Sequence, residues 1–125
     1  MEFKIDTKKT YTHIIPVAEQ IDANLTGAIR QKWNNTGQSG RLNLIVDLQG
    51  INQIGDNALE ELRTLQEDFK KNRQSIVFMG LPEQHISHFR RTGEEVAINI
   101  VPSLAEAVDI VNMEILERDL FDEEV

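Results

Sequence analysis

Residues 42–80 hold the pattern that most restricts the fold, because two short apolar segments flank one helical stripe. The first segment, LNLIVDL at 42–48, is apolar on both alternations, which is typical of a strand covered on both faces. The second segment is SIVFMG at 75–80. The stripe between them consists of Ala58, Leu59, Leu62, Leu65 and Phe69. A strand, a helix and a second strand in this order predict a parallel, right-handed crossover within an α/β domain.

The N-terminal part of the chain predicts an antiparallel strand pair followed by a helix. Apolar residues alternate with polar ones at the start, and 11–17 is rich in β-branched and aromatic residues, so the polar turn at 6–10 joins two strands. From Asp22 the apolar residues recur four apart, which predicts a helix ending in the loop 36–40. Its stripe consists of Leu25, Ile29 and Trp33.

The part of the chain after residue 81 predicts a short helix, a strand and a closing helix. The short helix carries Ile86 and Phe89, and Gly93 is its expected left-handed stop. The strand is VAINIV at 96–101. Ser103 and Glu106 then have the spacing of a capping box, which predicts that the closing helix begins there.

Negative charge is concentrated at the C-terminus. The whole chain has a formal net charge of −8, and residues 114–125 contain six acidic residues and one basic residue, a net charge of −5. We expect one domain over residues 1–117 and an acidic tail over 118–125, with the chain fraying beyond Leu116. The tail region also contains Leu120 and Phe121. We predict that these apolar residues dock on the domain or on a second copy, as a homodimer.

Composition restricts the class of protein and of partner. A chain of 125 residues fits one domain, and the absence of cysteine excludes disulfides and thiolate metal sites. This usage suits a reducing compartment, so we expect a cytoplasmic protein. The chain has no apolar run long enough to insert into a membrane and no apolar signal-peptide core. Lysine and arginine do not cluster, so we do not expect nucleic acid as the partner. We expect the partner to be a protein with a basic surface.

The sequence offers no framework for catalysis. It lacks a G-x-S-x-G elbow, a phosphate-binding loop of the G-x-x-x-x-G-K-[ST] type, a G-x-G-x-x-G run and an H-E-x-x-H pair. His85 and His88 lie three apart on the predicted short helix, but no third ligand is placed to complete a metal site. We therefore expect no enzymatic activity, no catalytic residue, no metal and no cofactor.

The residues that join the central strand to the following helix are the strongest candidate site. Two short acceptor side chains, Asp56 and Asn57, stand at that junction, after Gly55 and before Ala58. A loop that runs from the carboxyl end of a central strand into a helix start often binds ligands, because free backbone N–H groups point outward there. The simplest alternative is that Asp56 caps the helix, which stabilises a helix by ~1 kcal/mol.

The stretch VDLQGINQIGDNALEEL at 46–62 resembles the signature of the STAS domain family, the fold of anti-sigma factor antagonists. Asp47 matches the strand aspartate of that signature, Gly50 the turn glycine, Ile54 the apolar residue and Leu59 the helix leucine. The order of elements agrees over about residues 3–116, and SLAEAV at 103–108 resembles the family's S-x-x-E-A stretch. The resemblance implies one mixed sheet of about five strands with helices packed on it, in the order ββαβαβαβα.

The sequence departs from the family at the residues that carry regulation. Where the family has D-S-[ST]-G, this chain has Gly55, Asp56, Asn57 and Ala58, so Asp56 and Asn57 are a degenerate phosphoacceptor position. In the family a kinase phosphorylates a serine there and releases the antagonist from its anti-sigma factor. Two interpretations stay open: Asp56 supplies a fixed negative charge where phosphoserine would carry up to about two, or it only caps the helix.

The resemblance implies a non-enzymatic regulatory module that docks a partner protein through Gly55, Asp56, Asn57, Ala58 and Glu61. The implied partner is an anti-sigma factor or GHKL-type kinase. An alternative, also from the family, is a subunit of a lipid-transporting ABC system that binds the transporter ATPase. A weak nucleotide site at the helix start is a third interpretation, which the absence of a phosphate-loop lysine and the nearby acids disfavour.

Overall fold

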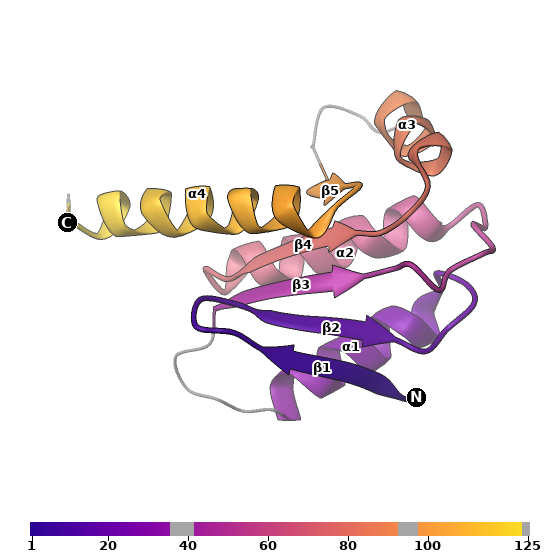
Figure 1. Cartoon of the computed structure of the whole chain (residues 1–125), viewed down its shortest axis with the longest axis horizontal. Helices are drawn as coiled ribbons and strands as arrows, with labels where there is room; N and C mark the ends of the chain where they lie inside the picture. The colour runs from indigo at the N-terminus through magenta and orange to yellow at the C-terminus, as the bar shows by residue number, and fades with distance from the viewer. Residues whose placement is uncertain (36–41, 93–97, 124–125) are drawn as a thin grey trace.

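A mixed sheet with helices on both of its faces forms the molecule (Figure 1). The computed structural model describes residues 1–35, 42–92 and 98–123. The elements along the chain are β1 (Phe3–Thr7), β2 (Thr12–Pro16), α1 (Ala23–Asn35), β3 (Asn43–Asp47), α2 (Ala58–Lys71), β4 (Ser75–Met79), α3 (Glu83–Thr92), β5 (Ile100–Val101) and α4 (Leu104–Glu123). This order is the predicted ββαβαβαβα.

The five strands lie side by side in the order in which they occur along the chain. β1 and β2 are antiparallel, and β2, β3, β4 and β5 are parallel to one another. In the central pair, Leu44 lies opposite Ile76 and Val46 opposite Phe78. The parallel pairing of β3 with β4 on either side of α2 confirms the predicted crossover, and the whole arrangement confirms a single mixed five-stranded sheet.

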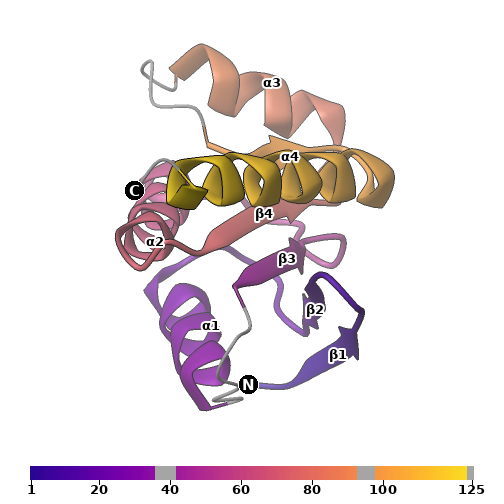
Figure 2. The same cartoon turned by 90° about the vertical axis from the view of Figure 1, so that its left-hand side faces the viewer.

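The alternation of side chains explains why the central strands are apolar throughout. Every residue of β3 and β4 is buried. Leu44, Val46, Ile76 and Phe78 face a core shared with α1, α2 and α3, whereas Ile45 and Val77 face a smaller core with Ala107 and Val111 of α4. Figures 1 and 2 show α1 and α2 together on one face and α4 on the other. Covering both faces removes the need for polar alternation.

Two helix starts are capped by side chains, of which the sequence predicts the second. The backbone N–H of Leu25 donates to Asp22 Oδ1 over 2.9 Å at the start of α1. At the start of α4, the Glu106 N–H donates to Ser103 Oγ over 3.3 Å and the Ser103 hydroxyl donates to Glu106 Oε1 over 3.0 Å. The predicted cap by Ser103 is therefore confirmed, although the Glu106 carboxylate accepts from the Ser103 hydroxyl, whereas in a capping box it accepts from the backbone N–H.

α2 ends in a motif that usually requires glycine. The Gln74 N–H donates to the Phe69 carbonyl over 2.8 Å and the Arg73 N–H to the Lys70 carbonyl over 3.0 Å. These two bonds define a Schellman ending. Arg73 occupies its left-handed position with φ of 57°. A side chain in that region strains the backbone.

The last strand is shorter than the sequence pattern indicates. β5 comprises only Ile100–Val101, and Ile98 and Asn99 are outside it. The reason is a side-chain competitor: the Asn99 N–H donates to Gln66 Oε1 over 2.7 Å. Because that N–H is occupied by α2, Asn99 pairs with β4 only through its carbonyl, which accepts from the Phe78 N–H over 2.8 Å, and the first residue of β5 in register with β4 is Ile100. The expected loop at 36–40, the Gly93 stop and the beginning of the 96–101 strand lie wholly or partly outside the described residues.

The prediction that the chain frays beyond Leu116 is wrong, because α4 continues through Glu123. The extension is attached to the sheet by Arg118. Its guanidinium donates to Asn43 Oδ1 over 2.7 Å, to Ser75 Oγ over 3.2 Å and to the Arg73 carbonyl over 3.3 Å. The proposed boundary at residue 117 therefore falls inside a helix, and a separate role for residues 118–125 stays a prediction.

Candidate functional site

Asp47, the last residue of β3, organises the chain that leads to the candidate site. Its carboxylate is buried, its Oδ1 accepts the Gln49 N–H over 3.1 Å, and its Oδ2 lies 3.1 Å from His13 Nε2 on β2. Gly80 packs directly against the Asp47 carboxylate. Its φ is +91°, and a Cβ at this position would lie 2.6 Å from Asp47 Oδ1. The signature aspartate is therefore a structural residue that fixes the turn after β3.

The loop between β3 and α2 is held by backbone hydrogen bonds. The N–H groups of Asn52 and Gln53 both donate to the Glu19 carbonyl, over 2.9 and 3.0 Å, and the Ile51 N–H donates to the Leu48 carbonyl over 3.0 Å. Ile51 is buried in the main core. These contacts tie the loop to the segment before α1, so the start of α2 is presented by a supported backbone.

α2 begins at Ala58, where the sequence places it. The Ala58 N–H donates to the Gly55 carbonyl over 3.2 Å, and the Glu61 N–H donates to the Asn57 carbonyl over 3.0 Å. Gly55, Asp56 and Asn57 are exposed, whereas the side chain of Ala58 is fully buried in the core. The exposed turn 55–57 is thus available to a partner, and Ala58 anchors it.

The prediction that Asp56 caps α2 is wrong. The N-cap residue is Asn57, with φ of −94° and ψ of 1°, and its side chain makes no capping hydrogen bond. A capping side chain reaches the first N–H groups from an extended backbone, and Asn57 is not extended. Within the described part of the chain, the Asp56 carboxylate has no hydrogen bond or ion pair either. Asp56 therefore presents its charge to solvent.

Glu61, predicted as part of the docking surface, is used inside the protein. The fully buried Thr26 of α1 donates its hydroxyl to Glu61 Oε2 over 2.8 Å. A second contact between the same helices joins Arg30 Nε to Asp68 Oδ2 at 2.9 Å. Glu61 therefore contributes to helix packing, and only part of its carboxylate remains for a partner.

Of the two acids in the first turn of α2, Glu60 is the one that remains on the surface. The Glu60 side chain is 68% exposed and lies 3.3 Å from the Arg63 guanidinium. We name Gly55, Asp56, Asn57 and Glu60 the helix-start patch.

The other sequence candidates are not brought together. His85 is half-buried and His88 exposed on α3. Over residues 1–35, 42–92 and 98–123, no three histidine, aspartate or glutamate side chains converge as metal ligands. Over the same ranges, no helix is both long and apolar enough to cross a bilayer.

The fold is shared with known proteins. A family model described as the STAS domain matches residues 4–107. No curated protein sequence is found to be similar to this chain. Among solved structures, a serine-to-glutamate variant of RsbS from Moorella thermoacetica is 12% identical, with 94% of this chain and 99% of that chain covered and a TM-score of 0.68.

Two further structures show the range of proteins that contain this fold. An anti-sigma factor antagonist from Mycobacterium paratuberculosis is 16% identical, with 89% of this chain and 93% of that chain covered and a TM-score of 0.65. The murine Slc26a9 anion transporter is 20% identical over 83% of this chain, with a TM-score of 0.64, and the match spans only 18% of the transporter. With its sheet order, its Asp47 turn and a family match over most of its length, the chain belongs to the STAS domain family.

Proposed function

We propose that the protein is a non-enzymatic regulatory module that binds a partner protein through the helix-start patch. The observation that carries the proposal is the exposed turn 55–57, which leads from the buried end of β3 into α2. Membership of the STAS family supports a binding role. Because the loop backbone is already held by the Glu19 carbonyl, docking costs little ordering entropy.

The patch has no hydroxyl group, so we propose that binding is not switched by serine phosphorylation at this position. Asp56 carries a fixed charge instead, and it is free of internal contacts within the described part of the chain. A carboxylate provides one negative charge, whereas a phosphoserine provides about −1.5 to −2 at neutral pH. The partner surface is therefore expected to be complementary to a constant, smaller charge.

The partner that we propose first is an anti-sigma factor or a GHKL-type kinase. The support is similarity to RsbS and to an anti-sigma factor antagonist, because the matches span 99% and 93% of those chains. In this role the protein occupies a surface of its partner and releases whatever that surface holds. No catalytic step is required.

The test is a titration of the purified partner kinase with the Asp56→Arg variant, followed by calorimetry. Reversing the charge at the centre of the patch is expected to raise Kd tenfold or more, which corresponds to a loss of about 1.4 kcal/mol in binding free energy. Glu2→Arg is the matched control, because it makes the same charge change at an exposed residue in the N-terminal segment. Equal binding by wild type and Asp56→Arg would exclude the patch, and no binding by either would exclude this partner class.

A second candidate partner is the ATPase of a lipid-transporting ABC system. Two observations favour it: the fold also occurs as a part of the Slc26a9 transporter, and the missing hydroxyl removes the phosphorylation switch. Co-expression with such an ATPase separates the candidates. If the protein forms a complex with the ATPase and Asp56→Arg disrupts that complex, the transporter role is favoured. If the protein forms a complex only with the kinase, the anti-sigma role is favoured.

A further inference from the structure

α4 has apolar residues on two opposite sides, and the sheet covers only one of them. Ala107 and Val111 are fully buried against the sheet. On the other side, Met113, Leu116 and Leu120 are 55%, 63% and 62% exposed. Their spacing of three and then four places them on one stripe of the helix. We call these three residues the outer stripe. Of the two docking sites predicted for the apolar residues of this segment, the domain itself does not cover Leu116 or Leu120, and docking on a second copy stays a prediction.

The outer stripe belongs to a helix that is held in place although it extends past the strands. Figure 1 shows the yellow end of α4 running past the ends of the neighbouring strands β3 and β4. Arg118 is half-buried, points to the sheet and bonds three groups there, so the last turns are fixed in orientation. An apolar stripe on a fixed helix is a preformed surface, which reduces the entropy lost on binding.

Charge on the same helix restricts what can cover the stripe. α4 contains seven acidic residues and one basic residue, Arg118, whose guanidinium is turned inward. Four acids with exposed side chains lie beside or within the stripe: Glu106, Asp109, Glu117 and Asp119. A second copy docked through this stripe would bring two such acidic rows together. Anionic membrane surfaces are disfavoured for the same reason.

The order of charge along α4 is also unfavourable for the isolated helix. A helix is stabilised by acids in its first turn and by bases in its last turn. α2 follows this rule, with Glu60 and Glu61 early and Lys70 and Lys71 late. α4 has no base in its last turn, which instead carries Asp122 and Glu123. Bound cations at this end would relieve the conflict.

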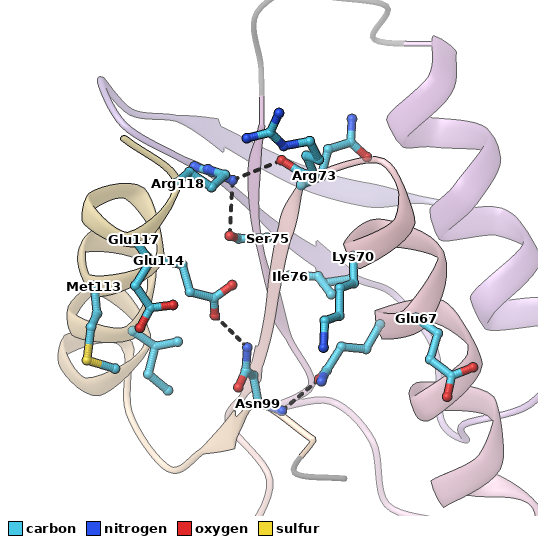
Figure 3. A pocket seen from close by; sticks show the side chains of 13 residues that line it. Glu67, Lys70, Arg73, Ser75, Ile76, Asn99, Met113, Glu114, Glu117 and Arg118 are labelled. Carbon is cyan, nitrogen blue, oxygen red and sulfur yellow. Dashed lines mark hydrogen bonds between the residues drawn. The ribbon is translucent and has the colours of Figure 1, made fainter. Parts of the chain in front are cut away.

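A groove of about 980 Å³ runs along one flank of the outer stripe, between α2 and α4 (Figure 3). It exists where β5 is too short to pair with the beginning of β4, so that Ile76 and Asn99 form its floor. Met113 lines the groove from α4 and Lys70 lines it from α2. Acids and bases both line this groove, so the groove does not favour one sign of charge in a bound segment. The acidic outer face of α4 does favour a basic segment.

We propose that the outer stripe is a docking surface for a basic amphipathic segment of a protein, in which apolar residues at helical spacing are flanked by lysine or arginine. The apolar side chains of that segment pack on Met113, Leu116 and Leu120. Its cations lie over the exposed Asp109, Glu117 and Asp119. This surface is distinct from the helix-start patch, because α4 returns along the sheet to the end at which β3 and β4 begin.

Two designed helical peptides test the proposal on the full chain. Both have leucines at positions i, i+3, i+4 and i+7, one with lysine flanks and the other with glutamate flanks. Fluorescence anisotropy is expected to show saturable binding of the lysine peptide and none of the glutamate peptide. Leu120→Gln is expected to weaken binding of the lysine peptide about tenfold. Val17→Gln, at a 57% exposed apolar residue outside α4, is the matched control and leaves binding unchanged.

Charge reversal and oligomeric mass complete the test. Asp109→Lys combined with Glu117→Lys is expected to transfer binding from the lysine peptide to the glutamate peptide. Equal binding of the lysine peptide by wild type and Leu120→Gln would show that binding depends only on non-specific charge attraction, which would overturn the proposal. Absence of binding of this peptide to wild type would overturn it too. A wild-type dimer in sedimentation that Leu120→Gln converts to a monomer would overturn it as well, because a second copy would then cover the stripe.

Discussion

The hydroxyl of Thr26 on α1 donates a 2.8 Å hydrogen bond to the Glu61 carboxylate on α2. Thr26 is fully buried, so the contact lies between the helices and not on the surface. Glu61 therefore belongs to the packing of the domain, although it is only a few residues from the exposed Asp56.

Thr26→Val is expected to destabilise the protein by ~1–2 kcal/mol, because it leaves a half-buried carboxylate without its donor. Urea unfolding followed by circular dichroism measures the change. Thr26→Ser, which keeps the hydroxyl, is the matched variant and is expected to lose less. A loss in Thr26→Ser as large as in Thr26→Val would show that the methyl group, and not the hydrogen bond, is responsible.

Gly80→Ala is expected to destabilise the protein by ~2–3 kcal/mol, because the backbone is left-handed and the new Cβ would meet Asp47 Oδ1 at 2.6 Å. Thermal unfolding measures this. Gly27→Ala is the control, since Gly27 lies inside α1 with no atom within 4 Å of the added Cβ. Alanine there is expected to stabilise the helix by up to ~1 kcal/mol. The same sign of change in both variants would contradict the assigned role of Gly80.

Removing the Arg118 guanidinium is expected to free the C-terminal turns of α4. Arg118→Met keeps the apolar stem but leaves the buried Asn43 without its donor, so we expect a loss of ~2 kcal/mol in the free energy of unfolding. Hydrogen exchange is expected to accelerate for residues after 116 and to stay unchanged in α1. Unchanged exchange in those turns would mean that the extension holds without this contact.

Arg73→Gly is expected to stabilise the protein by ~0.5–1 kcal/mol, because Arg73 occupies the left-handed position of a Schellman ending. The Arg73 carbonyl accepts from Arg118, and glycine retains that carbonyl. Differential scanning calorimetry measures the shift in Tm. Arg73→Ala keeps the strain and is expected to show no gain, so a gain of equal size in both variants would point to lost charge.

The sequence predicts the architecture well because burial follows periodicity. The doubly apolar pattern at 42–48 is the physical requirement for a strand between two layers, and β3 satisfies it at every residue. The stripe of α2 and the spacing of Ser103 and Glu106 are equally local signals, and both are confirmed. Each of these features depends on residues that are close together in the chain.

The features that the sequence did not predict depend on partners far along the chain. β5 is shortened by Gln66, which lies 33 residues before Asn99. The last turns of α4 are ordered by Arg118, which reaches Asn43 across 75 residues. In the site, the sequence predicts Asp56 as the cap, whereas Asn57 occupies the N-cap position and makes no side-chain capping bond. No short-range pattern carries this information.

The direction of β3 has a consequence for assembly. The strand begins at Asn43, which Arg118 of α4 contacts, and ends at Asp47, from which the chain proceeds to the start of α2. The two surfaces proposed here thus stand at opposite ends of one rigid strand. A ternary complex, with one protein held at each end, would need no rearrangement of the domain, and the spacing of the two bound proteins would be set by the sheet itself.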